Sequence, residues 1–215
     1  DWIELPVNNI SGEVVDIALH TITIRNWDNT LSRVPTKTFL TETYTNWQAM
    51  FSSGARRIMR SFYIDQTSIS FVNHAMLEPM TQIRGINEQL SKLMDGRELS
   101  AVGDRWFVEN GMTNLMIFRH YLTAWLAQRD DIHKEMYIVV RSMKPSSEGL
   151  PIEIYCFTSS VLWVDYEHTQ SAIFEYVYAI ANVFSLRIYQ RPAGSDLSFL
   201  AQERLRPESE HEAQT

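Results

Sequence analysis

Cysteine is almost absent from this sequence, since Cys156 is the only one among 215 residues. A single thiol excludes an intramolecular disulfide and allows a thiol-reducing compartment. Long apolar runs are missing as well. A membrane-spanning helix needs about 20 mostly apolar residues, and the best candidate, 115–127, is interrupted by Arg119 and His120. The sequence therefore predicts no disulfide framework and no membrane span within these residues.

Basic residues are also scarce. Lys and Arg total 19 against 26 Asp and Glu, which gives a net charge of −7. Proteins that bind a phosphate backbone depend on Lys and Arg, so nucleic acid is a poor candidate partner. The one basic cluster consists of Arg56, Arg57 and Arg60, close to Trp47. It leaves two interpretations open, contact with single-stranded RNA or a solvated strand face, and the charge balance favours the second.

Catalytic signatures are missing too. The sequence contains no G-x-S-x-G, H-E-x-x-H, G-x-G-x-x-G or P-loop motif. Its six histidines are scattered, and no pair has zinc-ligand spacing. Asp130 and Asp131 are interpreted as a solvated helix terminus, and Cys156 as an inert core thiol on a strand. We therefore expect no enzyme activity, no catalytic residues, no cofactor and no metal.

What is present is an ordinary globular composition, with 45% apolar and 21% charged residues. The first 48 residues follow a strand pattern. Residues 14–19 alternate with period two, and Ile22 and Ile24 continue on the opposite parity, which predicts a bulge or a sharp bend near His20 and Thr21. Residues 26–29 have turn chemistry, and a strand over 31–34 ends at Pro35. This pattern predicts a small β-barrel domain over 1–48.

A break at 46–54, softest at 52–54, separates this domain from a second one over 55–191. There the pattern predicts the following elements in order: a strand at 57–64, a helix from Pro79 to 93, a helix at 115–125, strands at 135–143 and 152–156, a helix from an N-cap at Asp165, and a strand at 186–188. Strand, helical crossover, two strands, helix and strand is the split βαβ plan. The crossover is longer than this plan needs, so about 66–112 is predicted to be a helical insertion. The tail, 192–215, is predicted to be disordered toward its end.

Several segments resemble a known family. The runs 1–4, 12–17, 23–30 and 34–36 resemble the β domain of MscS-type mechanosensitive channels. Residues 46–47, 56–58 and 63–65 are similar to the bacterial miniconductance subgroup, and 150–155 and 163–167 extend the match. The resemblance covers about 1–194 and implies an α+β fold, with an Sm-like β-barrel followed by a ferredoxin-like domain that carries the insertion.

The resemblance also implies a function. Family members open under membrane tension and release ions and small solutes on hypo-osmotic shock. They assemble as homo-oligomers, usually heptamers, below a pore formed by upstream transmembrane helices. The chain begins without Met, and we interpret it as the part of such a channel on the cytoplasmic side of a bacterial inner membrane. The alternatives are an Sm-like RNA-binding module and, ranked last, a ferredoxin-like enzyme domain.

Four residues are candidates for a subunit or domain interface. Trp27 lies in the predicted turn, where a large aromatic ring is either folded back onto its own chain or buried in a partner. Asp28 and Asn29 share that turn, and Trp47 lies at the break between the two predicted domains. We expect these four side chains to meet another subunit or the domain junction in an assembled channel.

Overall fold

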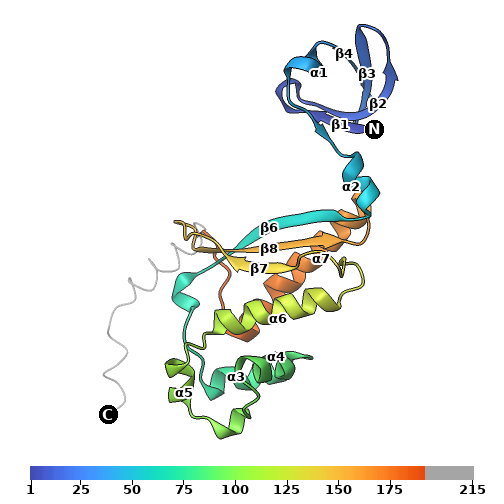
Figure 1. Cartoon of the computed structure of the whole chain (residues 1–215). Coiled ribbons are helices and arrows are strands. Elements are labelled where there is room, and N and C mark those ends of the chain that lie inside the picture. The colour runs from blue at the N-terminus through green and yellow to red at the C-terminus, as the bar shows by residue number, and fades with distance from the viewer. Residues whose placement is uncertain (192–215) are drawn as a thin grey trace, which may run out of the picture. The chain divides into compact units, whose positions relative to one another are not determined.

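Five antiparallel strands form the N-terminal part of the computed structural model, which describes residues 1–191. The strands are β1 (Trp2–Leu5), β2 (Ile10–Ile17), β3 (Thr21–Asn26), β4 (Leu31–Pro35) and β5 (Thr45–Asn46). Their order in the sheet is β4-β3-β2-β1-β5, and Figure 1 shows β1 to β4 curling around a common interior. No ladder joins the edge strands β4 and β5 within residues 1–191, so the sheet is not a closed barrel.

The concave side of this sheet holds a small apolar core. Alternating strand residues supply it, as the period-two pattern predicts. Its buried members are Ile3, Leu5, Ile22, Ile24 and Val34. The short helix α1 (Thr38–Thr41) adds Phe39, which packs against the same cluster. Each fully buried side chain of this size contributes about 1.5–3 kcal/mol relative to exposure, so the strand pattern itself supplies much of the stability of this sheet.

The parity switch near His20 comes from a sharp bend, which is one of the two predicted origins. Residues 18–20 form the turn between β2 and β3, closed by Ala18 N–H donating to the Thr21 carbonyl at 2.9 Å. A bulge is also present, but it lies earlier, where the β2–β3 register shifts between Val14 and Asp16. A tight turn resets side-chain parity as effectively as a bulge, which is why periodicity alone did not separate the two.

The predicted break after β5 contains a helix. Residues 48–53 form α2 (Gln48–Ser53), which ends at Gly54 in the left-handed conformation with φ of 70°. Glycine adopts this conformation without a steric penalty, so it is a favourable helix terminator. Ala55, the next residue, is already buried. The break is therefore ordered backbone and not an open linker.

A second sheet follows, with strands β6 (Arg56–Ile64), β7 (Val139–Ser142) and β8 (Leu150–Thr158) in the order β6-β8-β7. The long helices are α6 (Asn114–Gln128) and α7 (Trp163–Ile180), the latter continued by a 3-10 turn at Ala181–Phe184. Phe118 of α6 lies between Phe62 of β6 and Phe184, with ring centroids 6.2 and 5.0 Å apart. The predicted last strand is reduced to an isolated bridge between Ile64 and Ile188.

The described chain divides into two compact units. One comprises Asp1–Met59, Leu126–Ile138 and Tyr155–Glu175, and the other comprises Arg60–Trp125, Val139–Ile154 and the chain from Tyr176 on. The two sheets and the helices together form a mixed α+β fold with antiparallel sheets, so the predicted α+β class is confirmed. The domain limits 1–48 and 55–191 and the insertion limits 66–112 remain predictions. The predicted tail, 192–215, lies outside the described residues.

The region between β6 and α6 is helical, with α3 (His74–Thr81), α4 (Ile86–Leu93) and α5 (Asp104–Glu109). The single helix predicted from Pro79 to 93 is wrong. Asn73 starts α3 earlier, since its side chain accepts a hydrogen bond from Met76 N–H at 2.9 Å. Pro79 lies near the end of α3, and Gly85, with φ of 83°, separates the two helices. Because apolar spacing continued across Gly85, periodicity alone merged them.

His74 connects three segments of this helical region. Its Nδ1 lies 2.6 Å from Asp104 Oδ1, and its Nε2 lies 3.1 Å from the Leu99 carbonyl oxygen. Both ring nitrogens therefore face acceptors, and only the doubly protonated ring donates to both. The hydrogen bond to Asp104, followed by the one to the Leu99 carbonyl, raises the pKa of His74 above its ordinary value.

This arrangement predicts a pH-dependent stability. Because the folded pKa is raised, the contribution of His74 is complete below the unfolded value of about 6.5 and disappears as pH rises through the folded pKa. Hydrogen-exchange protection of 74–109 should therefore fall as pH rises above about 6.5, and His74→Gln should flatten this dependence. His168→Gln, at an exposed position of α7, is the matched control. An unchanged pH dependence in His74→Gln would show that another group is responsible.

Candidate functional site

The β3–β4 turn places the predicted interface residue Trp27. The turn is closed by Asn26 N–H donating to the Thr30 carbonyl at 2.9 Å. The Trp27 side chain remains 55% exposed, but it is not free. Its Nε1–H donates to Ser11 Oγ at 3.1 Å, and its ring centroid lies 4.0 Å from that of Trp2. The ring is also 5.9 Å from that of Trp163, so two intrachain aromatic neighbours hold one side of it.

Asp28 and Asn29 shape the same turn. The Asp28 carboxylate accepts hydrogen bonds from the Thr30 hydroxyl at 2.6 Å and from Thr30 N–H at 3.0 Å. These bonds lower the pKa of Asp28. Asn29 adopts the left-handed conformation with φ of 65°, which asparagine tolerates better than most residues. Both residues are exposed, and their visible role is to fix the turn that presents Trp27.

Trp47 lies at the start of α2, and β1 holds it in place. Its backbone N–H donates to the Trp2 carbonyl at 2.8 Å, and its Nε1–H lies 3.3 Å from Glu4 Oε2. Trp27 and Trp47 thereby line one cavity of about 200 Å³. Its lining residues are Trp2, Glu4, Ser11, Trp27, Trp47, Met50, Phe51 and Arg56. Sequence reasoning had not grouped Trp2 and Phe51 with the candidate residues, because only the β1 and α2 positions reveal that they converge.

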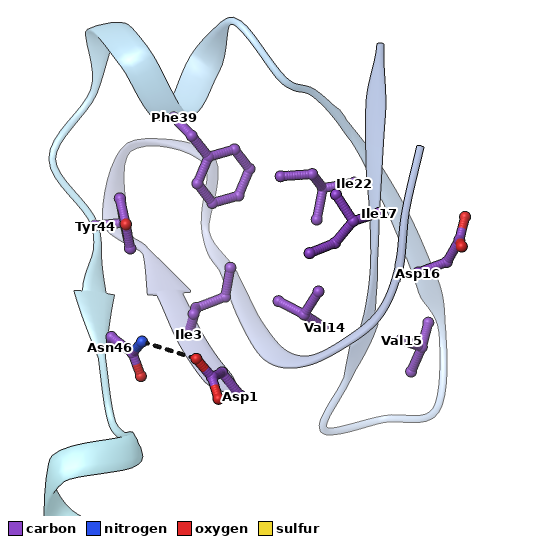
Figure 2. Close-up of a pocket in the computed structure, with 10 residues that line it drawn as sticks. All are labelled: Asp1, Ile3, Val14, Val15, Asp16, Ile17, Ile22, Phe39, Tyr44 and Asn46. Atoms are coloured by element: carbon purple, nitrogen blue, oxygen red, sulfur yellow. Dashed lines mark hydrogen bonds between the residues drawn. The ribbon is translucent and has the colours of Figure 1, made fainter. Parts of the chain in front are cut away.

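A larger opening lies on the concave side of the curled sheet. Figure 2 shows Ile3, Val14, Ile22 and Phe39 converging on it, while the side chain of Asp16 points away. The space measures about 600 Å³ and is open to solvent on the described chain. Asn46 Nδ2 donates to Asp1 Oδ2 at 3.2 Å at its rim. This opening arises because the sheet curls without closing, so part of its apolar interior stays accessible.

Exposed apolar residues continue around this sheet. Ile17, Leu19 and Leu31 are 71%, 83% and 61% exposed, and Leu40 next to β4 is 84% exposed. The edge strands β4 and β5 also carry unpaired backbone groups on their outer sides in the described residues. Single exposed apolar residues are common, but a group of them around an open sheet edge marks an association surface. This geometry suits packing against other protein.

The basic cluster has partners of its own. The Arg56 guanidinium lies 4.4 Å from the Tyr166 ring centroid, and that of Arg57 lies 5.9 Å from the Tyr155 centroid. Cation–π contacts of this kind occupy the two cations within the chain. Arg60, the third cation of the cluster, also interacts within the chain. Arg57 and Arg60 remain exposed on β6, as expected for a solvated strand face, while Arg56 is half-buried.

The residues weighed as chemical candidates have structural surroundings. Cys156 is completely buried in β8, and burial raises its thiol pKa to about 12, so almost no thiolate exists at neutral pH. Asp131 forms a bidentate pair with Arg129, at 2.8 and 2.6 Å. Within residues 1–191 there is no group of three or more His, Cys, Asp or Glu side chains suited to a metal ion. Across that same range, every helix falls short of the length and apolarity that crossing a membrane requires.

The comparison with protein families decides the identity of the curled sheet. Residues 1–49 match the family described as mechanosensitive ion channel, beta-domain. The curled sheet is thus a β domain of the mechanosensitive channel type. The sequence resemblance to this family is therefore confirmed, while the narrower assignment to the bacterial miniconductance subgroup remains a prediction.

Solved channel structures share the fold of the larger part of the chain. Arabidopsis thaliana MSL1 aligns with a TM-score of 0.56 at 10% identity, covering 88% of this chain and 52% of that one. Helicobacter pylori MscS in its closed state aligns with a TM-score of 0.50 at 12% identity, covering 90% and 56%. The chain thus spans about half the length of the structures it matches. At such low identity the likeness establishes the fold alone.

Proposed function

We propose that this chain is the cytoplasmic portion of a tension-gated mechanosensitive ion channel that releases ions and small solutes on hypo-osmotic shock. The observation that carries the proposal is the match of residues 1–49 to the channel β domain. The fold likeness over most of the chain to channels from a plant and a bacterium supports it. In this role the chain assembles and filters below a pore, and it catalyses no reaction.

The finer description of the fold belongs to this proposal. We infer an Sm-like β domain that neighbouring subunits complete, followed by a ferredoxin-like domain with a helical insertion. The order of the strands in the second sheet supports the ferredoxin-like plan. Residue 188 bridges to β6, which is followed by β8 and β7, and this is the order in which a split βαβ fold with a fourth strand arranges its strands.

Assembly is the next step of the proposal. The exposed apolar residues around β2, β4 and α1 and the open sheet edges suit a ring in which each subunit uses two different surfaces. We propose a homo-oligomer, with a heptamer as the expected count, and membrane attachment through helices that precede this chain in the full protein. A bacterial inner membrane is the proposed location. The comparisons give no support to the alternative of an Sm-like RNA-binding module.

Electrical recording tests the proposal. The full-length protein is reconstituted in liposomes, and excised patches are stretched by suction. We expect step currents that appear only above a threshold tension and that vanish when 1–49 is deleted. Expression of the same protein in cells without their own tension-gated channels should rescue survival of osmotic down-shock. Absence of tension-dependent currents from protein that is folded and inserted in the membrane would overturn the proposal.

The interface role proposed for Trp27 gives a separate prediction. Trp27→Ala removes a half-exposed ring, so it should change the melting temperature of this chain little. In the full channel it should weaken subunit association or shift the tension threshold, because interfaces derive much of their energy from buried aromatic rings. Thermal melting and tension-activated currents measure the two effects.

Trp27→Phe, which keeps an apolar ring, is the matched control and should retain most of the wild-type behaviour. A large melting loss in the isolated chain would identify Trp27 as an ordinary core residue. Unchanged subunit association together with an unchanged tension threshold would show that Trp27 has no interface role.

A further inference from the structure

Three of the six tryptophans of the chain line the 200 Å³ cavity described above. They come from separate segments: Trp2 from β1, Trp27 from the β3–β4 turn and Trp47 from the start of α2. Phe51 of α2 adds a fourth aromatic ring, and Met50 adds a polarisable thioether. A cavity with walls of this composition favours a ligand that carries a diffuse positive charge, because aromatic faces attract cations.

The hydrogen bonds that the lining side chains already make restrict the kind of cation that the cavity can bind. Trp27 Nε1–H is engaged by Ser11, and Trp47 Nε1–H by Glu4. A primary ammonium needs three acceptors, and the cavity wall offers chiefly the Glu4 carboxylate and the Ser11 hydroxyl, both already in use. A quaternary ammonium has no N–H groups to satisfy. It therefore loses little when it leaves water for aromatic walls.

The charges of the cavity wall are balanced. Glu4 contributes one carboxylate and Arg56 one guanidinium, which is held over the Tyr166 ring at 4.4 Å from its centroid. A simple cation would be attracted by the Glu4 carboxylate and repelled by the Arg56 guanidinium. A zwitterion can place its positive group near Glu4 and its negative group near Arg56, so both contacts are attractive.

We propose that this cavity binds a small zwitterion that joins a quaternary ammonium group to a carboxylate. The quaternary group lies among Trp2, Trp27 and Trp47, and the carboxylate lies toward Arg56. The space of about 200 Å³ far exceeds the 10–15 Å³ that admits one water molecule, yet it is below the range of drug-sized sites. Every lining residue belongs to one chain. Because Trp27 and Trp47 are also the residues proposed for a subunit interface, the site is tested on the chain by itself, where no neighbouring subunit covers it.

Calorimetric titration of the 215-residue chain with glycine betaine tests the proposal. The probe 3,3-dimethylbutanoate has the same shape and carboxylate but a neutral tert-butyl group, and choline keeps the quaternary group without the carboxylate. We expect glycine betaine to bind, choline to bind more weakly and the neutral isostere to bind at least tenfold more weakly than glycine betaine. The Trp47 indole N–H signal should shift on binding.

Variants locate the site. Trp47→Ala should weaken glycine betaine about tenfold, and Glu4→Gln, which preserves size, should weaken both quaternary ligands. Arg56→Gln should weaken glycine betaine without weakening choline. Tyr137→Ala, at a residue that is 80% exposed and outside the cavity, is the aromatic control and should leave all affinities unchanged.

Three outcomes would overturn the proposal. One is the absence of heat and of indole shifts at the highest soluble betaine concentration. Another is equal affinity for glycine betaine and its neutral isostere, because the aromatic walls would then act only as an apolar surface. The last is binding that survives both Trp47→Ala and Glu4→Gln, since this would place the ligand elsewhere on the chain. None of these results bears on tension-gated currents, so the two proposals fail separately.

Discussion

Replacing Asn114 with alanine is expected to destabilise the second unit by about 1–3 kcal/mol, because it removes two partly buried hydrogen bonds to backbone groups, each worth about 0.5–1.5 kcal/mol. Asn114 is fully buried at the start of α6. Its Oδ1 accepts from Ser70 N–H at 3.1 Å, and its Nδ2 donates to the Ser68 carbonyl at 2.9 Å. The same Nδ2 lies 3.4 Å from the Ser185 carbonyl. One amide side chain thus ties the segment after β6 and the segment after α7 to α6.

Alanine removes all of these bonds, since its methyl group can neither donate nor accept. Urea unfolding of the chain and hydrogen exchange of the Ser70 amide measure the loss. Asn87→Ala, at an exposed position of α4, is the matched control and should change stability by less than about 0.5 kcal/mol. Wild-type protection of the Ser70 amide in Asn114→Ala would show that Asn114 is not the residue that orders this junction.

The sequence pattern predicted those parts of the fold that depend on local chemistry. Apolar alternation identified the strands that became β3 and β4, and Asn and Asp between them identified the turn. Helical spacing from Leu115 to Trp125 identified α6, whose Phe118 occupies the core. In each case burial of one face dictates the period, and the period is visible without knowledge of any partner segment.

The pattern is less informative where the chain changes direction. At 18–20 it predicted a bulge or a sharp bend without deciding between them, and the structure has a turn there. Gly85 divided one predicted helix into α3 and α4. At both places the apolar pattern continues across the interruption. Periodicity shows which face of an element is buried. It does not show a change in chain direction when the elements on both sides of that change bury residues in the same core.

The candidate site could be predicted only in part. Trp27 and Trp47 stand out in the sequence because each lies where a strand pattern stops. Their meeting with Trp2 depends on β1 pairing with both β2 and β5, which is a property of topology. Partners that are many residues apart in sequence leave no local pattern, so the cavity they form could not be predicted from the sequence alone.

Replacing Gly12 with alanine is expected to destabilise the curled sheet by about 3 kcal/mol or more, at or above the upper end of ordinary overpacking costs. Gly12 is buried in β2 and lies opposite Asn26 of β3. A Cβ atom at this position would lie 2.6 Å from the Arg25 carbonyl carbon and 2.8 Å from Asn26 Cα, and still closer to the Arg25 carbonyl oxygen. These atoms are backbone, so they cannot move aside as the end of a side chain can.

The β2–β3 ladder must therefore separate locally, and the β3–β4 turn that carries Trp27 moves with it. We expect Gly12→Ala to lower the urea midpoint of the chain and to reduce hydrogen-exchange protection in β2 and β3. Gly103→Ala is the matched control: Gly103 has no heavy atom within 4 Å of the added Cβ and an ordinary φ of −94°. It should cost about 1 kcal/mol at most, well below Gly12→Ala, because the change removes only the N-cap preference of Gly103 and meets no backbone atom. Equal stability of the two variants would mean that β2 and β3 separate enough to accept a side chain at Gly12, and the close approach of their backbones would then not be what holds the turn in place.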